Sequence, residues 1–164
     1  NEFKKIALYE DDINWIFTDI DTLNVCNEAE ILNFFNKNKI DVCINCAAYT
    51  AVDKAEDDEA TARLVNATSV SYIAKTCKSH DSLLIHISTD YVFDGTSERA
   101  YREDDTVSPN SVYGKTKAEG EQFIMNSGTL QIQRQYLCVH KYHHVVLLWH
   151  INLLHWFYLQ NLLH

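Results

Sequence analysis

Residues 83–91 read LLIHISTDY, and this stretch decides the fold. The apolar run LLIHIS predicts a short buried strand, and the polar triplet TDY follows it directly. A second apolar run, DVCINC at 41–46, is followed in the same way by AAYT at 47–50. Short apolar strands that alternate with helices indicate a parallel sheet with helices on both faces. The sequence therefore predicts an α/β fold with a Rossmann-like, doubly wound parallel sheet, whose chemistry gathers where the strands end.

Helical patterns flank both strands. Asn27 is a candidate N-cap, and Glu30 stands three residues later in a capping-box arrangement. Apolar residues of the same segment, Ile31, Phe34 and Phe35, recur at helical spacing. Further elements are expected at these ranges: helices over 2–9, 56–79 and 111–126, and a strand over 14–18 that ends at Asp19.

Composition excludes several functions. The chain has 164 residues, 46% of them hydrophobic, which suits one domain with a core, and its net charge of -9 argues against a nucleic-acid surface. Its five cysteines form no four-ligand zinc set, so we expect reduced thiols, a cytoplasmic location and no metal site. The N-terminal residues show no apolar region typical of a signal peptide.

A boundary in composition falls near residue 128. Every acidic residue lies at or before Glu121, whereas six of the eight histidines follow Gly128. Polar residues interrupt the apolar stretch 145–163, so no membrane span is expected there. A histidine cluster at 140–144 lacks the ligands to complete a metal site. We expect residues 129–164 to be an aberrant or poorly ordered tail.

Three residues suggest catalytic chemistry. Tyr113 and Lys117 are four apart on a predicted helix and therefore share one face. A Lys ammonium beside a phenol should lower the pKa of the tyrosine, which could then exchange a proton with a carbonyl or alcohol oxygen. Thr89, at the end of the preceding strand, could hydrogen-bond the same oxygen. A Tyr-x-x-x-Lys pair alone is more often a surface pair. His86, within the strand, is predicted to be a core histidine with its hydrogen bonds satisfied.

This set resembles the Ser/Thr-Tyr-Lys set of the extended short-chain dehydrogenase/reductases. Within them, the chain is similar to the dTDP-4-dehydrorhamnose reductases over about residues 1–128. Four stretches carry the resemblance: FTDIDTLNV (17–25), INCAAYTAVDKAE (44–56), HISTDYVFDGT (86–96) and SVYGKTKAEGE (111–121).

The resemblance implies an oxidoreductase in which NADPH or NADH reduces the C4 carbonyl of dTDP-4-dehydro-L-rhamnose to dTDP-L-rhamnose, for polysaccharide biosynthesis. Tyr113 would donate the proton, Lys117 would lower its pKa and hold the nicotinamide ribose, and Thr89 would polarise the carbonyl. The cofactor would also meet Asp19, Asn24, Val25, Ala48, Tyr49 and Thr50. The dTDP-sugar substrate would meet Val52, Asp53, Lys54, Thr89 and Asp90.

The chain departs from the family pattern at a position that matters for the cofactor. The family opens with a strand and a glycine-rich turn that lets the backbone approach the pyrophosphate. This sequence has no glycine before Gly95. Residues 1–128 are therefore expected to form a partial NAD(P)-binding Rossmann domain without the first strand and the glycine-rich loop, and the fragment is expected to be inactive.

Other assignments stay open. A non-catalytic regulatory subunit, resembling the methionine adenosyltransferase β subunit, shares segments like those at 89–95 and 113–117. The stretch YTAVDKAE at 49–56 favours the reductases. A related nucleotide-sugar epimerase or dehydratase is a third reading. The resemblance also allows a homodimer in the intact parent.

Overall fold

The chain is described by a computed structural model covering residues 2–9, 13–102 and 104–128. Two strands, β1 (Val42–Asn45) and β2 (Leu83–His86), pair in parallel, with Val42 opposite Leu83 and Asn45 opposite His86. Because the strands are parallel, their carboxyl ends lie at the same edge of the sheet. This arrangement confirms the predicted parallel α/β pairing, and each strand begins one residue or less from its predicted start.

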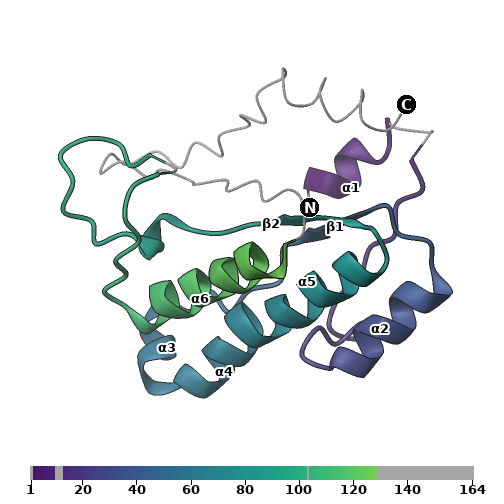
Figure 1. Cartoon of the computed structure of the whole chain (residues 1–164), viewed down its shortest axis with the longest axis horizontal. Helices are drawn as coiled ribbons and strands as arrows, with labels where there is room; N and C mark the ends of the chain where they lie inside the picture. Colours follow the sequence, from purple (N-terminus) through teal and green to yellow (C-terminus); the bar gives the residue numbers. More distant parts are fainter. Residues whose placement is uncertain (1, 10–12, 103, 129–164) are drawn as a thin grey trace.

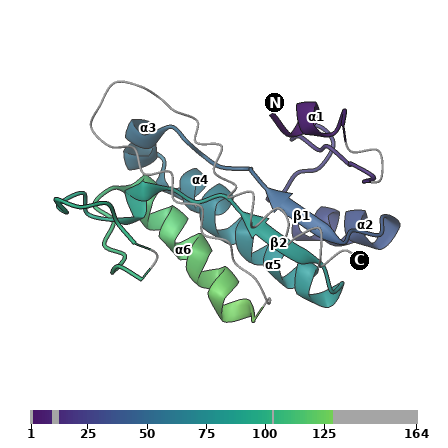
Figure 2. The same cartoon turned by 90° about the horizontal axis from the view of Figure 1, so that it is seen from above.

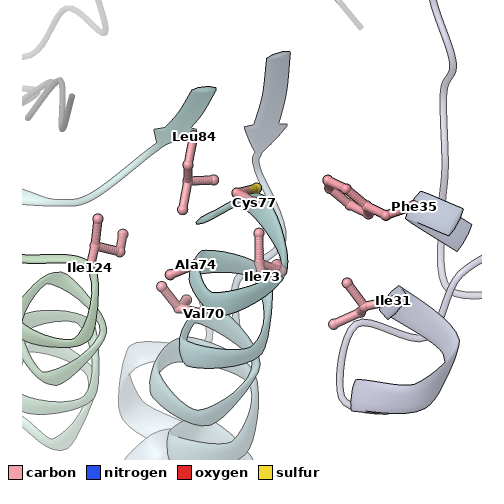
Figure 3. Packing of buried hydrophobic residues seen from close by; sticks show 8 residues of the cluster. All are labelled: Ile31, Phe35, Val70, Ile73, Ala74, Cys77, Leu84 and Ile124. Carbon is pink, nitrogen blue, oxygen red and sulfur yellow. The ribbon is translucent and has the colours of Figure 1, made fainter. Parts of the chain in front are cut away.

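Three helices cover one face of the sheet. α2 (Glu28–Lys37), α5 (Ser69–Ser79) and α6 (Val112–Ser127) lie on the same side of β1 and β2 (Figure 1). α5 runs between the other two, as the turned view also shows (Figure 2). Their apolar faces meet the strands in one core, drawn in Figure 3, whose fully buried members come from α2, α5, β2 and α6: Ile31, Phe35, Val70, Ile73, Ala74, Cys77, Leu84 and Ile124.

At the start of α2 the predicted Asn27 cap is confirmed, whereas Glu30 makes other contacts than those of a capping box. The Asn27 side chain accepts hydrogen bonds from the backbone N–H groups of Ala29 and Glu30, at 3.1 and 3.3 Å. The Glu30 carboxylate accepts from the backbone N–H of Asn24 and from the Asn27 side-chain amide. It thereby holds the chain that enters the helix, rather than closing a reciprocal box on the Asn27 backbone.

Helix 56–79 is wrong as a single predicted element. α3 (Val52–Asp57) ends at Asp58, whose side chain accepts from the backbone N–H of Thr61 and starts α4 (Glu59–Arg63). A π-helical segment, Leu64–Thr68, then joins α4 to α5. An Asp at an N-cap position competes with helix continuation through its own side chain, which explains the break.

Two N-terminal predictions also need correction. α1 spans Glu2–Ile6, shorter than the predicted 2–9. Residues 14–18 form no strand, because within the described chain they have no ladder partner. A strand is defined by its pairing, so an apolar, extended segment without a neighbour does not become one. Within the described residues no helix is both long and apolar enough to cross a membrane, and the stretch 145–163 lies outside them.

Candidate functional site

The segment after β2 turns at once because of its own side chains. Thr89 caps a 3₁₀ turn, Asp90–Val92, by accepting from the backbone N–H of Tyr91 at 3.3 Å. Its hydroxyl also donates to the Asp90 carboxylate at 3.2 Å. Hydroxyl and carboxylate side chains stabilise such turns locally, so the sequence Thr-Asp fixes this bend. The bend leaves Thr89 beside the end of the sheet.

The first turn of α6 is held against this bend. Ser111 caps the helix by accepting from the Gly114 backbone N–H at 3.0 Å, and the Glu56 carboxylate of α3 accepts from the Val112 N–H at 2.8 Å. A Cβ added to Gly114 would lie 2.2 Å from the Tyr91 carbonyl oxygen. Only glycine allows this approach, which brings the α6 residue Tyr113 to Thr89.

Tyr113 lies beside the strand end that carries Thr89. The Tyr91 ring packs edge-on against the Tyr113 ring, with centroids 5.5 Å apart. Burial raises the pKa of the Tyr113 phenol, the neighbouring Thr89 side chain lowers it, and the charge of Asp90 raises it. The expected lowering of this pKa by Lys117 is therefore wrong for the chain as described, because burial outweighs the favourable contact.

The Lys117 amine is directed elsewhere. The residue is 2% exposed, and its Nζ donates to the Ile87 carbonyl oxygen at 2.7 Å. It also lies 3.4 Å from His86 Nε2. Burial lowers the pKa of Lys117 to about 8, while the charges of Glu121 and Cys46 act in the opposite direction. Lys117 thus lies at the end of β2. The residue that it bonds, Ile87, is one position before Ser88 and two before Thr89.

The buried polar side chain of His86 lies next to the Lys117 amine. His86 is 3% exposed, and its Nδ1 lies 3.1 Å from the side-chain nitrogen of Asn45 on the neighbouring strand. Glu121, one helical turn after Lys117, accepts from the Ser88 hydroxyl. The prediction that His86 is a satisfied core histidine is confirmed. The sequence did not identify Asn45 and Glu121 as residues of the candidate site. A strand asparagine and a helix glutamate form no recognisable pattern, and their roles become visible only when the strands and helices pack together.

Asn66 is a further residue that the sequence did not reveal. It is fully buried in the π-helical segment, and its side chain accepts from the Tyr49 N–H at 2.8 Å and donates to the Tyr49 carbonyl at 3.1 Å. The same amide donates to the Thr116 hydroxyl at 3.1 Å. A Cβ on Gly120 would lie 2.2 Å from the Asn66 carbonyl oxygen, so α6 packs directly on this segment. Asn66 therefore joins the loop after β1 to the helix that carries Tyr113 and Lys117.

The other predicted site residues divide into two groups. Tyr49 and Val52 pack against the cluster of Ala55, Ala62 and Tyr113, whereas Asp53 and Lys54 are exposed on α3. Ala48 and Thr50 belong to the loop that Asn66 holds.

The second group precedes α2. The Asp19 carboxylate accepts from the backbone N–H and the hydroxyl of Thr22, and this pairing lowers its pKa. Asn24 accepts from the Cys26 N–H, and Val25 packs against the main core. No described contact joins this group to Tyr113.

His86 should make the fold sensitive to acid. Burial, together with the charge of Lys117, lowers its pKa from 6.5 to about 3. Between these values the unfolded chain binds a proton that the folded chain does not, so stability is lost as the pH falls. We expect about 2 kcal/mol less free energy of unfolding at pH 5 than above pH 7 from this group. Urea unfolding at a series of pH values should show the dependence in the wild type and lose that part in His86→Gln; equal slopes would contradict it.

A strand-end hydroxyl beside a tyrosine, with a buried lysine one helical turn later, on a Rossmann-like layer, is the arrangement of the short-chain dehydrogenase/reductases. The family model of the RmlD substrate binding domain matches residues 4–136, and the chain belongs to this family.

Relatives and solved structures agree with this assignment. A curated dTDP-4-dehydrorhamnose reductase of Aggregatibacter actinomycetemcomitans is 42% identical over 107 residues, which are 65% of this chain and 36% of that protein. The crystal structure of a dTDP-4-dehydrorhamnose reductase from Clostridium acetobutylicum has a TM-score of 0.72 and 41% identity, over 74% of this chain and 44% of that one. One from Bacillus anthracis, in complex with NADP, has a TM-score of 0.73 and 29% identity, over 82% and 49%. The chain thus spans less than half the length of these proteins.

Proposed function

We propose that the protein to which this chain corresponds reduces the C4 carbonyl of dTDP-4-dehydro-L-rhamnose to the alcohol, at the expense of NADPH or NADH. The observation that carries the proposal is the interaction of the Thr89 side chain with the Tyr113 phenol at the carboxyl end of β2. Two neighbouring hydroxyl groups could both hydrogen-bond to one sugar oxygen. The reductase names of the relatives favour this activity over a regulatory subunit.

The proton of the reaction comes from Tyr113. A phenol whose pKa is raised by burial holds its proton at neutral pH, so Tyr113 carries the proton that the reaction needs. As the C4 carbon gains a hydride, the carbonyl oxygen gains charge and takes the phenolic proton, which yields the alcohol and a phenolate. Thr89, beside the same phenol, would stabilise this developing charge. Asp90, which Thr89 contacts, would face the sugar.

The residues present fit the two ends of a dinucleotide but not its pyrophosphate. Its reduced nicotinamide, when bound, supplies the hydride. Tyr113, Lys117 and the loop 48–50 would hold the nicotinamide ribose, and the exposed carboxylate of Asp19 can accept from a ribose hydroxyl. Asn24 and Val25 would lie near the adenine. A glycine-rich phosphate cradle does not occur among these residues, since the first glycine is Gly95.

The remaining partners follow from the same assignment. Val52, Asp53 and Lys54 on α3 would contact the dTDP-sugar, since Val52 packs against the cluster that contains Tyr113. A cytoplasmic location is consistent with the free thiols of Cys26, Cys43, Cys46 and Cys77. The homodimer stays a prediction.

A chimaeric enzyme tests the proposal. Residues 4–128 would replace the matching segment of the Clostridium acetobutylicum reductase, which supplies the rest of the fold. We expect substrate-dependent oxidation of NADPH with kcat/KM within about tenfold of the host enzyme, a change of about 1.4 kcal/mol in barrier. The host enzyme is the positive control. A chimaera that melts like the host and binds NADPH, yet reduces no dTDP-4-dehydro-L-rhamnose, would refute the assignment.

A further inference from the structure

A buried chain of hydrogen bonds leads from the loop after β1 to the amine of Lys117. It begins at the backbone N–H of Ala47, which donates to the Asn45 side-chain oxygen at 3.0 Å. This contact identifies the oxygen of the Asn45 side-chain amide, because a backbone N–H can only donate and its partner must be an acceptor. The Asn45 NH₂ group is therefore the end that faces His86 Nδ1, at 3.1 Å.

The amide orientation decides the tautomer of His86. An NH₂ group has hydrogens to give and no lone pair to offer, so His86 Nδ1 must be the acceptor. A neutral imidazole carries one proton, which then sits on Nε2. The ring is neutral at ordinary pH, since burial and the charge of Lys117 lower its pKa to about 3.

The proton on Nε2 points at Lys117. The Lys117 Nζ lies 3.4 Å from Nε2 and already donates to the Ile87 carbonyl oxygen at 2.7 Å. An ammonium group has no lone pair, so it could not accept from the Nε2–H of His86, and the hydrogens of the two groups would face each other. A neutral amine has one lone pair, and it can accept from Nε2–H while donating to Ile87.

We propose that His86 is a positioning residue of the site: held as the Nε2–H tautomer by Asn45, it presents an N–H to Lys117 and favours the uncharged amine. Its importance for turnover rests on the proposed function, whereas the tautomer itself does not.

The other groups around Lys117 oppose this effect. Glu121 of α6 and Cys46, just after β1, both favour the charged amine, whereas burial disfavours it. The balance keeps the pKa of Lys117 near 8 rather than at its ordinary value of 10.5. An amine near neutrality can gain or lose a proton at working pH, so His86 would set the alkaline part of the pH profile through Lys117.

The tautomer can be measured in the wild-type chain without any activity. Long-range ¹H–¹⁵N correlation spectra of the 164-residue chain, labelled at histidine, distinguish protonated from unprotonated ring nitrogens. His86 is assigned by the signals that disappear in His86→Gln. We expect a protonated Nε2 and an unprotonated Nδ1 at pH 7; a proton on Nδ1, or on both nitrogens, would overturn the proposal.

Titration of the Lys117 amine, followed by side-chain NMR and assigned with Lys117→Met, tests the consequence. His86→Leu removes the N–H and should raise the proton affinity of Lys117 about tenfold. His86→Gln keeps an N–H donor in reach and should stay within about threefold of wild type. The control is His80→Leu, which removes a histidine that bonds Asn36 instead and should change nothing.

These outcomes separate the two proposals. Equal titration of Lys117 in the wild type, His86→Leu and His86→Gln would mean that His86 only fills space, and the inference would fail. If His86→Leu does not fold, the wild-type tautomer still decides. An inactive chimaera whose His86 shows the Nε2 proton would instead refute the proposed reaction alone.

Discussion

Tyr113→Phe, introduced into the chimaeric reductase, should lower kcat by about 10²- to 10⁴-fold, the usual contribution of a positioned general acid. The variant removes one oxygen, and with it the only proton that the proposed reaction draws from this side chain. NADPH affinity should change little, because the ring keeps its place in the cluster with Ala55 and Ala62. Steady-state kinetics and a calorimetric NADPH titration measure the two quantities on the same preparation.

Tyr91→Phe is the matched control for this variant. Tyr91 packs edge-on against Tyr113 and also carries a hydroxyl, but it is 48% exposed. Its loss should change kcat by no more than about threefold. Near-normal turnover in Tyr113→Phe, or equal losses in the two variants, would remove the proton-donor assignment and leave the contact with Thr89 a structural one.

Asn66→Ala should destabilise the fold by about 3 kcal/mol. The substitution leaves the backbone N–H and carbonyl of Tyr49 without their partner inside the protein. The Thr116 hydroxyl loses the bond it accepts from Asn66 and keeps the one it donates to the Tyr113 carbonyl. Buried polar groups left in this way cost about 1–3 kcal/mol each, and water entering the space recovers part of that loss. Urea unfolding of the 164-residue chain at pH 7 measures the difference.

Asn36→Ala provides the comparison for Asn66→Ala. Asn36 is an exposed asparagine whose side chain bonds one partner, His80. Because water can replace that partner, the variant should lose less than about 1 kcal/mol. If Asn66→Ala were no more destabilised than Asn36→Ala, the loop after β1 would not depend on the π-helical segment. Contacts other than those of Asn66 would then connect this loop to α6.

Local patterns were sufficient for the elements that carry the site. The runs DVCINC and LLIHIS mark β1 and β2, because short apolar runs are typical of strands in parallel sheets. The Asn27 cap and the spacing of Tyr113 and Lys117 were likewise readable, since caps and helical faces depend on residues within one turn. The breaks at Asp58 and Leu64 were missed, because the apolar pattern continues across them.

The sequence by itself determined the parallel α/β class, and it selected the strand ends and the three residues Thr89, Tyr113 and Lys117 as the candidate site. Tertiary structure alone decided their electrostatics. The Lys117 amine contacts the Ile87 carbonyl and the His86 ring. The pKa of Tyr113 is raised by burial and is not lowered by Lys117. The physical reason is that a pKa reports desolvation and neighbours from distant parts of the chain, and neither exists until the helices and strands pack together.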